Sequence, residues 1–158
     1  MSHGAALSYL LKSFDITKLQ PLVVDIGAAD GKYTSNSYPL IMDHKWHGVL
    51  IEPQERQLDR ARAYHKDHLD RVRFFPSAIC EQDGAATLFL HPNDGDGTTT
   101  SNHGSSLLPI PGSRVQTTIN TMSYNSLVDV VDFDTVGLLS IDAEGYDMEI
   151  LRGIFEAT

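Results

Sequence analysis

The stretch VVDIGAADGKYTSNS, residues 23–37, decides the fold, because a short apolar run turns at once into a cluster of glycine, alanine and acid. The run begins after Pro21 and ends at Gly27, and its β-branched residues are typical of a strand buried on both faces. Small residues after such a strand let the backbone approach whatever lies above the turn. The stretch therefore predicts a strand followed by a ligand-binding loop.

The spacing of the glycines indicates which ligand the loop suits. Asp25, Gly27 and Gly31 form the pattern D-x-G-x-x-x-G, which lacks the middle glycine of the dinucleotide-binding pattern and disfavours a pyrophosphate. The carboxylates of Asp25 and Asp30 would repel a phosphate but can pair with an ammonium or sulfonium group. The loop thus favours an adenosyl ligand that carries a positively charged amino acid.

A second apolar run, WHGVLIEP at residues 46–53, predicts a strand that ends on Glu52. An acid at the end of the second strand, about 20 residues beyond a glycine loop, can accept hydrogen bonds from both ribose hydroxyls. Glu52 alone could equally cap the helix that follows, where the helix dipole favours an acid. Together with the glycine loop it predicts a nucleoside site.

The rest of the chain alternates strands and helices. Pro53 fits the first turn of a helix that buries Leu58, Ala61 and Tyr64. Further expected elements are a helix over 5–14, a strand over 72–79 with Pro76 at its end or at a bulge, a hairpin from 86–92 and 114–121, a helix over 123–133, a strand within 136–145 and a helix over 146–155. This order predicts an α/β fold, a mostly parallel, doubly wound sheet whose ligands bind at the carboxyl ends of the strands.

Length and composition predict one globular domain over residues 1–158, with 41% hydrophobic and 21% charged residues. No apolar run reaches the ~18 residues of a membrane span, and without a secretory signal we expect a cytoplasmic protein. The net charge of −9 disfavours nucleic acid as a partner. Cys80 is the single cysteine, which excludes an internal disulfide. Residues 56–73 interleave basic and acidic residues, so we expect a solvated face on which His65 and His68 face solvent rather than a metal.

Three blocks resemble the FkbM-type family of S-adenosylmethionine-dependent methyltransferases, which has a Rossmann-like, class I methyltransferase fold. They are residues 23–37, residues 46–53 and LLSIDAEGYDMEILRG at residues 138–153. The last is the most diagnostic, because it has an acid-x-Glu-Gly-x-acid segment followed by a leucine and a glycine. The resemblance covers nearly the whole chain in order and spacing, and it implies S-adenosylmethionine as the cofactor.

The resemblance also implies roles for individual residues. It places Asp25, Gly27, Ala28, Asp30 and Gly31 around the methionine half of the cofactor, and it places Glu52 on the ribose. Beside the adenine it places Ser77 and Ala78, and the floor of the methyl-transfer site would be formed by Asp142, Glu144 and Gly145. Ser105 and Ser106 would line the mouth of the substrate site. Ser35 and Asn36 match a Ser-Asn pair of one branch of the family, with no role assigned.

Methyl transfer from a sulfonium to a hydroxyl needs positioning and a base for the hydroxyl proton. Asp142 is the first candidate base because it ends the strand nearest the expected methyl, and Glu144 is the second. Alternatively, both acids cap the helix that begins at Tyr146, or Asp142 positions the cofactor amine. His103 in the polar loop is a third candidate base, and the NDGDG segment at 93–97 lacks the later Glu of a calcium loop, so no metal site is expected.

The family's sheet continues with further strands after the helix over 146–155, so the chain is expected to be truncated after its fourth parallel strand, to be a small natural variant, or to be completed by a partner or a second copy. Two functions remain open. The first is O-methylation of a hydroxyl on a sugar, glycan or secondary metabolite. The second is a catalytically silent binding or assembly module. Nucleic-acid methylation is disfavoured by the acidic balance and by the lack of an Asn/Asp-Pro-Pro-aromatic segment.

Overall fold

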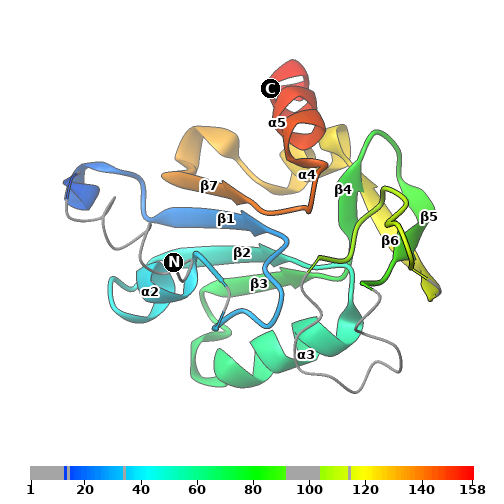
Figure 1. Ribbon diagram of the computed structural model, residues 1–158. Helices are drawn as coiled ribbons and strands as arrows, with labels where there is room; N and C mark the ends of the chain where they lie inside the picture. Colours follow the sequence, from blue (N-terminus) through cyan, green and yellow to red (C-terminus); the bar gives the residue numbers. More distant parts are fainter. Residues whose placement is uncertain (1–12, 14, 34, 92–103, 114) are drawn as a thin grey trace.

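The computed structural model of the protein describes residues 13, 15–33, 35–91, 104–113 and 115–158. Its centre is a four-stranded sheet in the order β3-β2-β1-β7, with all neighbours parallel. The strands are β1 (Leu22–Ile26), β2 (His47–Ile51), β3 (Val72–Phe75) and β7 (Leu138–Ile141). This confirms the predicted α/β fold with a parallel, doubly wound sheet (Figure 1). The helix expected over residues 5–14 lies almost wholly outside the described residues.

The strand register brings the carboxyl ends of three neighbouring strands level. Ile26 at the end of β1 pairs with Ile51 of β2 and with Ile141 of β7. The loops that follow these strands therefore share one edge of the sheet, where ligands of open α/β sheets bind.

Helices cover both faces of this sheet (Figure 1). On one face lie α2 (Tyr38–Met42) and α3 (Glu55–Tyr64), and on the other α4 (Tyr124–Val130) and α5 (Asp147–Ala157). Short 3-10 turns are η1 (Ile16–Lys18), η2 (Lys66–His68) and η3 (Phe133–Thr135). Successive residues of β1 serve opposite cores, because Val23 packs with Leu40 whereas Val24 packs with Ile150. Each buried side chain of this size stabilises the fold by ~1.5–3 kcal/mol relative to exposure.

A smaller sheet, in the order β4-β6-β5, lies beside the first. Its strands are β4 (Ala78–Cys80), β5 (Gly84–Phe89) and β6 (Gln116–Ser123). The antiparallel pairing of β5 with β6 confirms the predicted hairpin. The prediction of a single strand over residues 72–79 was wrong, because these residues form two strands, β3 and β4, that belong to different sheets. Pro76 lies between them because it has no N–H to donate to a ladder.

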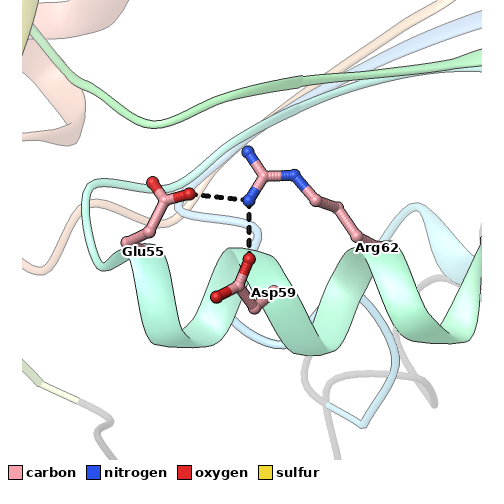
Figure 2. A network of polar contacts seen from close by, with 3 residues as sticks. All are labelled: Glu55, Asp59 and Arg62. Atoms are coloured by element: carbon pink, nitrogen blue, oxygen red, sulfur yellow. Dashed lines mark hydrogen bonds and ion pairs between the residues drawn. The ribbon is translucent and has the colours of Figure 1, made fainter.

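Helix α3 begins two residues later than expected, with Gln54 as its N-cap and Pro53 ahead of it. Its inner face buries Leu58 and Ala61, as predicted, whereas Tyr64 is half-buried. The outer face carries a charge network in which Arg62 contacts Glu55 at 2.7 Å and Asp59 at 2.8 Å (Figure 2). Exposed pairs of this kind contribute at most ~1 kcal/mol each, so this face is solvated as expected.

Helices α4 and α5 pack together over β1 and β7. The Ser123 side chain accepts a hydrogen bond from the Ser126 N–H and caps α4. Helix α5 buries Ile150 and Ile154, while Tyr146 lies just before its first residue. Among the described residues, no helix combines the length and apolarity needed to cross a bilayer.

Candidate functional site

The loop after β1 folds tightly onto the end of β2. Gly27, Ala29 and Gly31 all have positive φ angles, of 81°, 47° and 68°. A Cβ at Gly27 would collide with the backbone carbonyl oxygen of Asp142. One at Gly31 would lie 2.6 Å from the Ala61 Cβ atom. Glycine is therefore required at both positions, by conformation and by space.

Three consecutive amides of this loop bond to the end of β2. The N–H groups of Gly27 and Ala28 donate to the Ile51 carbonyl, at 2.9 and 3.1 Å. The next N–H, of Ala29, donates to Oε2 of Glu52 at 3.1 Å. The glycine loop and Glu52 thus converge at one place on the sheet edge.

Glu52 is a buried carboxylate with acceptor capacity to spare. Its Oε1 atom accepts from the Gln54 N–H at 2.9 Å, so each oxygen has one backbone donor and a second lone pair. Burial raises the pKa of the Glu52 carboxyl to about 7, the charge of Asp25 adds to the rise, and the two N–H donors oppose it. Glu52 therefore changes its protonation state near neutral pH.

A cavity of about 330 Å³ opens beside Glu52, within the size range of ligand pockets. Its polar lining includes Glu52, Ser77, Asp142 and Glu144, and much of its apolar wall comes from Ala78, Ile79, Leu88 and Leu107. Of the residues predicted for the cofactor, Gly27, Glu52, Ser77, Ala78 and Asp142 line it. Ser77 and Ala78 reach it beyond the end of β3 rather than by ending that strand, and Ala78 opens β4.

Asp25 does not line the cavity, although it was expected beside the cationic half of the ligand. It is 1% exposed, and its Oδ2 atom accepts from the hydroxyls of Ser35 at 2.9 Å and Ser37 at 2.7 Å. Burial raises the pKa of the Asp25 carboxyl, and the serine donors oppose that rise. Asn36 donates to the Ser140 hydroxyl at 3.2 Å. The Ser-Asn pair thus ties the loop to β1 and β7.

The other loop residues predicted to contact the cofactor also serve the loop itself. Asp30 accepts hydrogen bonds from the backbone N–H groups of Lys32 and Tyr33, at 3.0 and 2.9 Å. Ala28 is fully buried and packs in the core with Ala61. Neither residue lines the cavity, and nor does Gly31.

The turn between β7 and α5 forms another part of the cavity wall. Asp142 and Glu144 both line the cavity, and Glu144 has a positive φ of 49°. Within the described chain, the acid that caps the turn is Asp147, which accepts from the N–H groups of Ala143 at 2.8 Å and Gly145 at 3.1 Å. The sequence had suggested, as the alternative to a catalytic role, that Asp142 and Glu144 both cap this helix. An acid two residues after Gly145 was the available signal.

His65 is fully buried, so the expectation that it faces solvent was wrong. Its Nε2 atom lies 2.9 Å from the Gly31 carbonyl oxygen, and its ring centroid lies 5.5 Å from that of Tyr38 and 6.3 Å from that of Phe74. Burial lowers the pKa of this imidazole. His65 therefore supports the glycine loop through its contact with the Gly31 carbonyl oxygen. The described part of the chain contains no cluster of three or more His, Cys, Asp or Glu side chains suited to a metal ion.

The remaining candidates have different outcomes. His103 and the segment 93–97 lie outside the described residues. Ser105 lines the cavity, as do Tyr146 and Ile150, which were expected only to form part of the helix over 146–155. These residues come from segments far apart in the chain, so no local pattern marks them.

Comparison with known proteins identifies the family. The profile described as the methyltransferase FkbM domain matches residues 25–158. No curated protein matches the sequence. A solved structure entitled "Crystal structure of hMettl16 catalytic domain in complex with MAT2A 3'UTR hairpin 6" is similar at 16% identity with a TM-score of 0.39, and the match covers 98% of this chain and 50% of that one. This chain thus spans about half the length of that structure. Because the family profile covers most of the sequence, the chain belongs to the FkbM methyltransferase family.

Proposed function

We propose that this chain is an S-adenosylmethionine-dependent methyltransferase whose cofactor binds in the cavity beside Glu52. The observation that carries the proposal is the bond from the Ala29 N–H to Glu52, which brings the glycine loop and a buried carboxylate to one cavity wall. Membership of a methyltransferase family gives the reaction class, and such enzymes generally use this cofactor.

The residues of the cavity fit the parts of that cofactor. Glu52 has one lone pair free on each oxygen for the two ribose hydroxyls. Gly27 leaves room for the amino-acid portion, and the apolar wall at Ala78 and Ile79 suits a base. The negative charges of Asp142 and Glu144 suit a ligand with ammonium and sulfonium groups.

When bound, S-adenosylmethionine would supply an electrophilic methyl group on its sulfonium. The chain's own contribution is to hold an acceptor hydroxyl in line and to take its proton. We assign the proton to the Asp142 carboxylate, with Glu144 as the second candidate, because both line the cavity. The proposed acceptor is a hydroxyl of a sugar, glycan or secondary metabolite, and the net charge of −9 argues against nucleic acid.

Calorimetry with S-adenosylmethionine and S-adenosylhomocysteine tests the cofactor site. Ala78→Phe would fill the cavity wall, and Ala63→Phe is the matched control because Ala63 is exposed on α3. We expect the parent and the control to bind both ligands and Ala78→Phe to bind neither. The cofactor proposal is wrong if the parent does not bind, or if the filled cavity binds as well as the parent does.

A product screen with labelled S-adenosylmethionine against hydroxylated sugars, glycans and metabolites tests the reaction. Label transferred to an acceptor oxygen would support O-methylation, and Asp142→Asn should slow that transfer by about 10²- to 10⁴-fold. Cofactor binding without transfer to any acceptor would instead favour the catalytically silent module.

A further inference from the structure

A strap formed by residues 104–108 joins the small sheet to the turn between β7 and α5. Ser106 exchanges two backbone hydrogen bonds with Phe89 of β5, at 2.9 and 3.0 Å. Its hydroxyl donates to the Glu144 carbonyl at 2.8 Å and accepts from the Leu108 N–H at 3.1 Å. Ser106 itself is 4% exposed, and its two side-chain bonds are partly buried. One buried residue therefore connects β5, the strap and the turn.

The turn that Ser106 holds has a backbone conformation that needs support. Glu144 has a φ of 49°, and a residue with a side chain in this region costs about 1–2 kcal/mol relative to the right-handed conformation. Asp147 fixes the N–H groups on both sides of Glu144, and Ser106 fixes its carbonyl. Removal of the Ser106 hydroxyl leaves that carbonyl free to rotate with the turn.

The strap and the turn are both walls of the cavity. Ser105 and Leu107, on either side of Ser106, line it together with Asp142 and Glu144. The Glu52 end is held separately, by the backbone of Ala29 and Gln54. The part of the cavity at Asp142 and Glu144, where we place the acceptor and which we call the acceptor end, can therefore shift while the part at Glu52, where we place the ribose, stays fixed.

We propose that Ser106 is a positioning residue that sets the orientation of Glu144 and of the acceptor end of the cavity. This proposal rests on the proposed function for its meaning in catalysis. The structural claim, that the Ser106 hydroxyl holds the turn in a strained backbone conformation, does not depend on any ligand.

Amide hydrogen exchange of the ligand-free chain tests this structural role of the Ser106 hydroxyl. Ser106→Ala should speed exchange of the Gly145 and Leu108 N–H groups about tenfold, which corresponds to the loss of one hydrogen bond of about 1.4 kcal/mol. Ser106→Thr keeps the hydroxyl and should restore slow exchange. Ser113→Ala is the matched control, because the Ser113 hydroxyl also bonds a backbone carbonyl, that of Val115 at 3.1 Å, and does not line the cavity.

A double-mutant cycle distinguishes positioning from a general loss of stability. Glycine adopts positive φ freely, so in Glu144→Gly the turn no longer needs the Ser106 bond. In that background Ser106→Ala should change the exchange rate of the Gly145 N–H by less than about threefold. If the single Ser106→Ala variant does not fold, the comparison of Glu144→Gly with the double variant still tests the proposal. Unchanged Gly145 exchange in Ser106→Ala, or an equal effect in both backgrounds, would overturn the proposal.

Ligand measurements link the turn to the site. Ser106→Ala should bind S-adenosylmethionine within about threefold of the parent, while kcat toward an acceptor found in the screen falls more than the affinity does. A fall in cofactor affinity that matches the fall in kcat would contradict a role at the acceptor end. If the parent binds no S-adenosylmethionine, the proposed function fails, whereas the exchange experiment still decides what Ser106 does.

Discussion

Replacement of Glu52 by glutamine should make the chain more stable at alkaline pH and at the same time weaken its cofactor site. Glu52 is buried, and burial raises its pKa from 4.5 to about 7. A difference of about 2.5 pKa units corresponds to about 3 kcal/mol of penalty for the ionised carboxylate in the folded state. Glutamine has no charge and avoids that penalty.

The amide also removes favourable contacts. One of the two backbone donors, of Ala29 or Gln54, would face the NH₂ group and lose its acceptor, at a cost of about 1–3 kcal/mol. The net change at pH 8 should therefore lie between about zero and 2 kcal/mol in favour of Glu52→Gln. Cofactor affinity should fall about 10- to 100-fold, because the charged acceptor for the ribose hydroxyls is lost.

The pH dependence has a definite sign. The folded-state pKa of Glu52 is above its unfolded value, so its contribution to stability is fully present at pH below 4.5 and is lost as the pH rises through about 7. Urea unfolding should show the parent losing about 2–3 kcal/mol relative to Glu52→Gln between about pH 5 and pH 8. Glu55→Gln is the matched control, because Glu55 is exposed and pairs with Arg62, and it should change stability by less than about 1 kcal/mol.

Two results would contradict this account of Glu52. One is a parallel pH dependence for the parent and Glu52→Gln, which would mean that the carboxyl is not penalised by burial. The other is unchanged affinity for S-adenosylmethionine in Glu52→Gln, measured by calorimetry at pH 8, which would remove Glu52 from the cofactor site.

Three further changes test the support of the glycine loop. Gly27→Ala should lower the unfolding free energy by about 2–5 kcal/mol in urea titrations, because the new Cβ meets the Asp142 carbonyl at a positive φ; a loss below about 1 kcal/mol would contradict that packing. Asp25→Ala should cost about 2–4 kcal/mol by thermal unfolding, since it leaves buried serine donors without an acceptor, and an unchanged Tm would show that these bonds contribute little. His65→Gln should remove part of the loss of stability that the parent shows in acid. The folded-state pKa of His65 is lowered, so its contribution to the unfolding free energy is present above the unfolded pKa of 6.5 and is lost as the pH falls below it. Equal slopes of unfolding free energy against pH below 6.5 in the two proteins would exclude His65 as a cause.

Much of the main sheet could be predicted from sequence because its signals are local. The apolar runs around Val24 and Val49 are bounded by Pro, Gly and acid, and each became a buried parallel strand. The convergence of Gly27 and Glu52 followed from the rule that parallel strands end at one edge. The helix expected over 146–155 is α5, which buries Ile150 and Ile154.

The features that were missed depend on contacts between distant segments. Nothing local distinguishes fully buried His65 from half-buried His68, because the burial of His65 comes from Tyr38 and Phe74. The partners of Asp25 are hydroxyls in a loop without periodicity. The division of residues 72–79 between two sheets depends on what β4 pairs with, which is β6, some 40 residues further along the chain.

The attachment of three successive loop amides to the end of β2 has a consequence for engineering cofactor selectivity. Ile51 and Glu52 anchor the same loop that, in the proposed complex, would make room for the amino-acid portion of the ligand, while Glu52 would also bind the sugar. A substitution that displaces β2 must therefore move both contact regions as one unit. Variants that accept enlarged cofactor analogues should be sought at Leu88 or Leu107 in the small sheet and the strap, where the cavity wall can be reshaped independently.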